Sequence, residues 1–154
     1  MDRGITFFDS TLISVRYSYV DRMKFVYHVH YLEFFEWARS DWMKKFWKPY
    51  REIEEQGDAL VVVEARIRYL RPAFYDDLLL TFVRPYDWGR SRLEFEYLIK
   101  RSGEEESVCR GHTIHCYVGS DGKPKPFPTD LREVLEKLAQ KFSSQVNFSL
   151  SSTK

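Results

Sequence analysis

The sequence predicts an α+β fold in which one antiparallel five-stranded sheet wraps around a long central α-helix. Near the N-terminus, a strand-like segment precedes a run whose apolar residues recur three and four positions apart. Four alternating apolar and charged runs follow, separated by turn residues. A long helix with a bulky apolar face needs a large surface to pack on, and a curved sheet provides one. We expect a single domain over residues 1–154, with a core at about 10–142 and a polar tail at 143–154.

The helical part of this prediction depends on residues 29–47. One wide face of that segment is apolar, and charged residues occupy most of the remainder. The apolar face comprises Tyr31, Phe34, Phe35, Ala38, Trp42 and Phe46. Pro49 closes the helix, and residues 50–56 are expected to form a short helix that ends at Gly57.

The strand signals lie on both sides of this helix. Residues 11–19 alternate as a strand does, and residues 20–25 break the pattern as a loop. The later strands are expected at 59–70, 78–88, 91–100 and 107–118. Three prolines keep residues 123–128 extended, and a final amphipathic helix is expected from Thr129 to Phe142.

Composition excludes several classes of protein. The net charge is +1, whereas a general nucleic-acid binder normally carries a strong basic excess. No apolar run reaches the roughly 18 to 20 residues that span a membrane, and residues 1–10 lack the apolar stretch of an export signal. Cys109 and Cys116 would lie roughly 23 Å apart in one strand and cannot bridge each other, so free thiols favour the cytoplasm.

One stretch combines groups suited to acyl transfer. Asp21 stands in a polar loop, and Tyr27, His28 and His30 open the long helix shortly afterwards. Unpaired N–H groups and the positive dipole end of a helix can stabilise an oxyanion, while a nearby acid supplies a nucleophile or a base. By pattern alone, Asp21 is better explained as a loop residue that caps a turn.

Three stretches resemble a known family. They are the run of strand, Asp, turn, Tyr-His and helix at Tyr17–Arg39, the segment YLRPAFYDD at 69–77, and the closing turn DGKP at 121–124 with Pro128. Together they resemble the 4-hydroxybenzoyl-CoA thioesterase-like family of hotdog-fold acyl-CoA thioesterases, over about residues 10–140. The family usually has Gly where Lys24 stands and often Asn where His30 stands, and these departures bear on substrate choice.

The resemblance implies roles for the residues of the first stretch. Asp21 matches the family's essential acid, acting either as nucleophile on the thioester carbonyl or as general base for water. The backbone N–H of His28 would point at the thioester oxygen, and its imidazole would orient water or substrate. Tyr27 and His28 are grouped with Asp21 as catalytic candidates, although both rings could serve only to pack the helix entry. His30 is expected to be structural or to line the substrate pocket.

The resemblance also implies a substrate and partners. In the family, basic residues near the turn at Gly89 contact the nucleotide of coenzyme A. Arg90, Arg92, Lys123 and Lys125 are therefore candidates for its phosphates, against ordinary surface charge. The resemblance implies a fatty or aromatic acyl-CoA as substrate, with no cofactor and no metal. It also implies a homodimer, with a homotetramer as a larger assembly. Two alternatives stay open: an acyl carrier protein as the acyl donor, and a non-catalytic acyl-CoA-binding protein.

Other reactive side chains have plainer explanations. His112, His115 and Cys116 invite a metal site, but two histidines three residues apart in a strand point to opposite faces. Cys109 is expected to be a core thiol. Glu36 and Arg39, three residues apart, are expected to pair on the helix surface.

Overall fold

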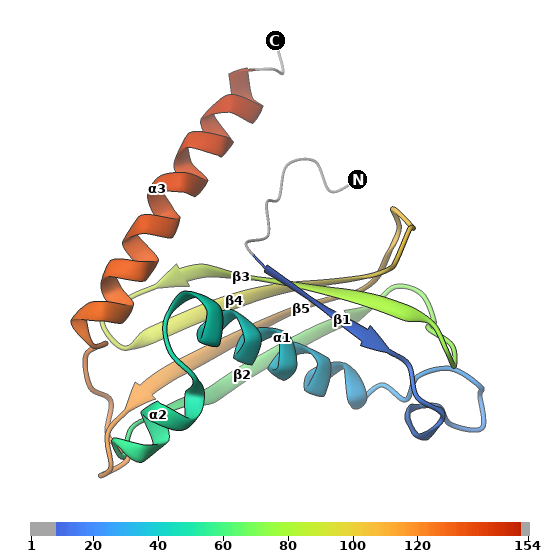
Figure 1. Cartoon of the computed structure of the whole chain (residues 1–154), viewed down its shortest axis with the longest axis horizontal. Coiled ribbons are helices and arrows are strands. Elements are labelled where there is room, and N and C mark those ends of the chain that lie inside the picture. Colours follow the sequence, from blue (N-terminus) through green and yellow to red (C-terminus); the bar gives the residue numbers. More distant parts are fainter. Residues whose placement is uncertain (1–8, 152–154) are drawn as a thin grey trace.

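A computed structural model describes residues 9–151 and shows one five-stranded sheet with a long helix along one face (Figure 1). All strand pairs are antiparallel, in the order β1-β3-β4-β5-β2. The strands are β1 (Asp9–Ser14), β2 (Ala59–Tyr69), β3 (Leu78–Trp88), β4 (Arg92–Arg101) and β5 (Ser107–Val118). The helices are α1 (His30–Phe46), α2 (Tyr50–Glu55) and α3 (Thr129–Ser151), with a 3₁₀ turn at Tyr17–Tyr19. The predicted fold class is confirmed.

The core lies between α1 and the sheet, because the apolar stripe of the helix meets the inward-facing residues of β4 and β5. Phe35 stacks on Tyr97 of β4 with ring centroids 4.4 Å apart. Gly111 of β5 lies directly beneath the same ring, and a Cβ atom there would stand 2.1 Å from Phe35. Glycine therefore lets the helix approach the sheet closely at this point.

The two edges of the sheet differ in what they expose. Strand β2 is one edge, and Val61, Val62 and Val63 lie consecutively on it with 43%, 48% and 61% of their surface exposed. A bulge between Val62 and Glu64 interrupts its pairing with β5. Strand β1 is the other edge and exposes Leu12. An exposed row of valines on an unpaired edge strand is a natural place for another strand to pair.

Two predicted boundaries are wrong. The strand expected at 11–19 ends at Ser14, because Ser14 pairs with Leu78, the first residue of β3, and no partner strand continues beyond it. Alternation of side chains cannot reveal where the partner strand stops.

The final helix continues from Thr129 to Ser151 and projects away from the sheet (Figure 1), so the segment 143–151 of the expected polar tail is helical. It contains neither Gly nor Pro to end the helix. Residues 152–154 of the tail, and residues 1–8 on which the export interpretation depends, lie outside the described residues.

Candidate active site

The loop that carries Asp21 is closed by short backbone pairings. Val20 pairs with Val26, and Phe25 pairs with Phe74, which places the loop beside the start of β3. The carboxylate oxygen Oδ1 of Asp21 accepts a hydrogen bond from the N–H of Met23 at 2.8 Å, so the turn-capping role is present. That bond engages one carboxylate oxygen and holds the exposed side chain in place.

Lys24 completes this turn in a left-handed backbone conformation. Its φ is 67°, and its N–H donates to the carbonyl of Asp21 at 2.9 Å. This conformation favours glycine, the residue the resembled family usually has here, because a Cβ atom crowds the following carbonyl. The side chain of Lys24 is exposed beside the acid.

Asp21 and His28 line the same cleft. Its volume is about 420 Å³, and it lies between the loop, the start of α1 and the end of β2. Its lining comprises Asp21, Phe25, Val26, His28, Tyr31, Tyr69, Leu70, Arg71 and Pro72. Most of the wall is aromatic or aliphatic, and Asp21, His28 and Arg71 are its charged or polar members. The structure thus brings together two of the three predicted catalytic residues.

The N–H of His28 lies just before α1 and has no backbone acceptor among the described residues. Helix α1 begins at His30, and no side chain caps its N-terminus. Within residues 9–151, the N–H of His28 is without a backbone acceptor, whereas the N–H of His30 donates to the carbonyl of Tyr27 at 3.1 Å. An unpaired N–H at the positive end of a five-turn helix can stabilise negative charge that develops on a carbonyl oxygen.

The other two aromatic candidates near Asp21 lie outside the lining. Tyr27 is 43% exposed, and its ring contacts the ring of His28 at 4.5 Å. His30 is occupied by neighbours on α1 and the 3₁₀ turn: its Nδ1 lies 2.7 Å from Glu33 Oε1, and its ring contacts Tyr19. These contacts match the packing alternative for Tyr27 and the structural alternative for His30.

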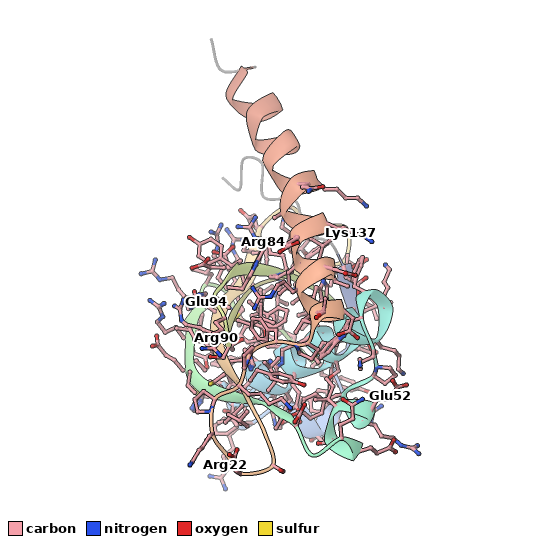
Figure 2. All side chains as sticks on the ribbon, turned by 90° about the vertical axis from the view of Figure 1, so that its left-hand side faces the viewer. Arg22, Glu52, Arg84, Arg90, Glu94 and Lys137 are labelled. Atoms are coloured by element: carbon pink, nitrogen blue, oxygen red, sulfur yellow. The ribbon has the colours of Figure 1, made fainter. Side chains whose placement is uncertain are left out.

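The four basic candidates lie at the opposite end of the sheet. Asp21 is beside the start of β3, and Arg90 follows its end, roughly 33 Å away along ten strand residues. Figure 2 shows the molecule from this far end, with Arg90 beside the start of α3. Lys125 forms an ion pair of 2.8 Å with Asp58 there, and Arg92 pairs with Glu94. Within this one chain, none of the four reaches the cleft; Lys123 is exposed in the closing turn.

Sequence reasoning missed much of the cleft wall. Tyr69, Arg71 and Pro72 come from the segment at the end of β2, which the sequence presents as a family motif without indicating that it lines a site. The helical spacing places Tyr31 on the apolar face of the helix and gives no sign that it also lines the cleft. Burial raises the pKa of the phenols of Tyr31 and Tyr69, so both remain neutral hydrogen-bond donors. Arg71 pairs with Glu106 at the mouth of the cleft.

The histidines and thiols of β5 do not assemble a metal site. As predicted, His115 faces the core and is fully buried, whereas His112 lies on the outer face beside Glu94 and Arg66. In the part of the chain that the structure describes, no three His, Cys, Asp or Glu side chains gather around a common point. Cys109 is free and buried, as expected of a core thiol, and burial raises the pKa of its thiol to about 12.

Arg39 does not pair with Glu36 as expected. Its Nη1 donates to the hydroxyl of Tyr97 at 2.9 Å, beneath the helix. The Tyr97 hydroxyl also lies 2.8 Å from Thr113 Oγ1, which in turn lies 2.8 Å from His115 Nε2. Arg39 therefore begins a polar chain that runs through Tyr97 and Thr113 to His115 in the core.

Comparison with known proteins identifies the family of this chain. Residues 15–135 match the family described as the thioesterase-like superfamily. The chain belongs to this superfamily. It is 29% identical over 141 residues to the acyl-CoA thioesterase YbgC of Haemophilus influenzae, covering 90% of this chain and 98% of that protein. None of the helices within residues 9–151 has the length and apolarity to cross a membrane.

Two solved structures of thioesterases share the fold. A DHNA-CoA thioesterase from Staphylococcus aureus superposes with a TM-score of 0.80 at 27% identity, over 85% of this chain and 90% of that one. A thioesterase from Thermus thermophilus, solved with coenzyme A and Zn, gives 0.75 at 28% identity, over 88% and 96%. The hotdog-type fold expected from the thioesterase-like motifs is thereby confirmed.

Proposed function

We propose that this protein is an acyl-CoA thioesterase that hydrolyses its substrate to a free carboxylic acid and coenzyme A. The observation that carries the proposal is that Asp21 and His28 line the same mostly apolar cleft, and that the N–H of His28 has no backbone acceptor within residues 9–151. Membership of the thioesterase-like superfamily, and relatives named as acyl-CoA thioesterases, support the reaction class.

The chemistry follows from the two groups. The thioester oxygen would accept a hydrogen bond from His28, and one such donor typically lowers the barrier by about 2.7–4 kcal/mol. Asp21 then acts by one of two routes. It either attacks the carbonyl, giving an acyl-aspartyl intermediate that water hydrolyses, or it takes a proton from a water molecule that attacks directly. In both routes the thiolate of coenzyme A leaves and gains a proton.

A second copy of the chain would complete the site. Pairing β2 with β2 of a partner about a two-fold axis would continue the sheet and cover the exposed valines. The same rotation reverses the strand direction, so it would bring the partner's Arg90 end of the sheet to the side where Asp21 lies. We therefore propose a homodimer whose basic residues hold the nucleotide of a substrate that reacts in the other protomer. A homotetramer of two such dimers, in the cytoplasm, completes the proposal.

The first test replaces the proposed catalytic acid. Asp21→Asn keeps the hydrogen bond to Met23, since asparagine forms the same turn, but removes the nucleophile or base. We expect at least a hundredfold loss of thiol release from short, long and aromatic acyl-CoAs. Asp121→Asn is the matched control, because Asp121 Oδ1 accepts from the N–H of Lys123 at 2.9 Å in an equivalent turn. Full activity of a folded Asp21→Asn variant would refute the proposal.

The second test identifies the acyl donor. The same acyl chain is presented on coenzyme A and on acyl carrier protein, and kcat/KM is compared. We expect the higher value with coenzyme A. A preference for the carrier protein would favour that alternative, and tight binding of acyl-CoA without turnover would favour a non-catalytic binding protein.

A further inference from the structure

Tyr69 connects the edge strand to the turn that opens α1. It is the last residue of β2, and its hydroxyl donates to the backbone carbonyl of His28 at 3.0 Å, across 41 residues of sequence. Its ring also contacts the rings of Tyr31 at 5.4 Å and His28 at 6.2 Å, in edge-to-face geometry. Three contacts therefore tie this one side chain to the cleft wall and to the turn.

This bond gives a partner to a carbonyl that lies just outside the helix, because α1 begins at His30. Inside an α-helix, a carbonyl accepts from the N–H four residues later, which for His28 would be that of Leu32. Here the N–H of Leu32 donates to Val29 at 3.2 Å, and the carbonyl of His28 accepts from Tyr69. A side chain from the sheet thus holds the His28–Val29 peptide. The phenol stays protonated, because burial raises its pKa, and remains a donor throughout the neutral range.

We propose that Tyr69 is the positioning residue of the oxyanion site, orienting the turn at 27–29 so that the N–H of His28 faces the thioester oxygen. This inference rests on the proposed function, and it assigns Tyr69 no contact with the reacting atoms. Because Tyr69 belongs to the edge strand that a second copy would pair with, it also links assembly to the geometry of the turn.

Tyr69→Phe tests the inference by removing only the hydroxyl. Because one neutral hydrogen bond to the turn is lost, we expect kcat to fall about three- to tenfold. KM should remain within twofold, because the ring still lines the cleft. Tyr75→Phe is the matched control: Tyr75 is an exposed tyrosine on the nearby turn, outside the cleft, and its loss of hydroxyl should leave kcat unchanged.

An inert ligand separates positioning of the oxyanion donor from a general effect on the cleft. A thioether analogue of the best acyl-CoA lacks the carbonyl and so cannot use the His28 N–H. Its dissociation constant should be the same for Tyr69→Phe and the unaltered protein. If kcat and the affinity for the thioether fell by the same factor, the inference would be overturned, because the substitution would have changed the shape of the cleft. An unchanged kcat would also overturn it.

Failure of this inference is distinguishable from failure of the proposed function. If Asp21→Asn abolishes hydrolysis while Tyr69→Phe retains full kcat, the thioesterase proposal stands and the role of Tyr69 falls. If the unaltered protein releases no thiol from any acyl donor, both fall together. Amide hydrogen exchange at residues 27–29 provides a readout independent of activity: we expect faster exchange in Tyr69→Phe, and unchanged exchange would contradict the inference.

Discussion

At the residue scale, the left-handed backbone of Lys24 is the clearest departure from the resembled family. A side chain in this conformation typically costs about 1–2 kcal/mol, part of which glycine loses again through its greater freedom in the unfolded chain. The strain stands three residues from the proposed catalytic acid. The side chain of Lys24 is exposed, and we propose that its ammonium group binds an anionic part of the substrate.

Lys24→Gly and Lys24→Ala separate conformation from charge. Both remove the ammonium group, but only glycine relieves the strain. We expect Lys24→Gly to be about 0.5–1 kcal/mol more stable than Lys24→Ala in urea unfolding. Both should raise KM for acyl-CoA by a similar factor if the ammonium binds substrate. Equal stability of the two variants would count against the strain.

We expect the free energy of unfolding to depend on pH because of the buried imidazole of His115. Burial, and then the positive charge of Arg39, lower the pKa of its imidazole to about 3, while the unfolded chain keeps the ordinary value near 6.5. Between pH 3 and pH 6.5 the imidazole of His115 therefore binds a proton in the unfolded chain but not in the folded one. The stability that the neutral imidazole contributes is complete above pH 6.5 and is lost as the pH falls toward 3.

The measurement compares urea unfolding of the unaltered protein and of His115→Gln at pH 7 and pH 5. Other groups titrate in both proteins, so the difference isolates His115. From pH 7 to pH 5 the unaltered protein should lose about 2 kcal/mol more than the variant. Parallel losses in the two proteins would show that His115 is not held neutral.

At the element scale, the close approach of α1 to β5 depends on Gly111. Gly111→Ala would force the added methyl group into the buried ring of Phe35, which is itself stacked on Tyr97. We expect a loss of about 1–3 kcal/mol in the free energy of unfolding. Gly89→Ala is the control, since nothing lies within 4 Å of a Cβ atom at that position.

The double variant identifies the clash as the cause. Adding Phe35→Leu to Gly111→Ala removes the ring that the methyl group meets. The double variant should be at least about 0.5 kcal/mol more stable than the sum of the two single effects predicts. Strict additivity would place the cost of Gly111→Ala elsewhere, in the strand itself.

At the scale of the whole molecule, we expect the dimer to form through the β2 edge of the sheet and not through the β1 edge. Val63 is 61% exposed on β2 and Leu12 is 59% exposed on β1, so the pair is closely matched. A lysine in an edge strand opposes pairing with another strand. We expect Val63→Lys to sediment as a monomer and to lose thiol release. We expect Leu12→Lys to keep both the dimer and the thiol release. An intact assembly of Val63→Lys would exclude β2 as the interface.

Local patterns determined most of the elements. The spacing of apolar residues predicted α1 within one residue at each end, and the turns at Gly57, Gly103 and Gly122 each have the positive φ that glycine permits. These features depend on side chains and backbone angles close together in the chain, which sequence displays directly. The alternating pattern does not predict the end of β1 correctly, because β1 ends where its partner β3 begins, at Leu78, much later in the chain.

For the site, the family motif at Tyr17–Arg39 indicates the candidate acid and the turn before α1, because both lie within one short stretch of the chain. Which other groups line the same cleft became known from the folded chain alone. It added Tyr69 from the far end of β2 and placed Arg90 and Lys125 roughly a whole strand length from Asp21. The physical reason is that the pairing of strands sets distances between residues remote in the chain, and local periodicity carries no information about that pairing.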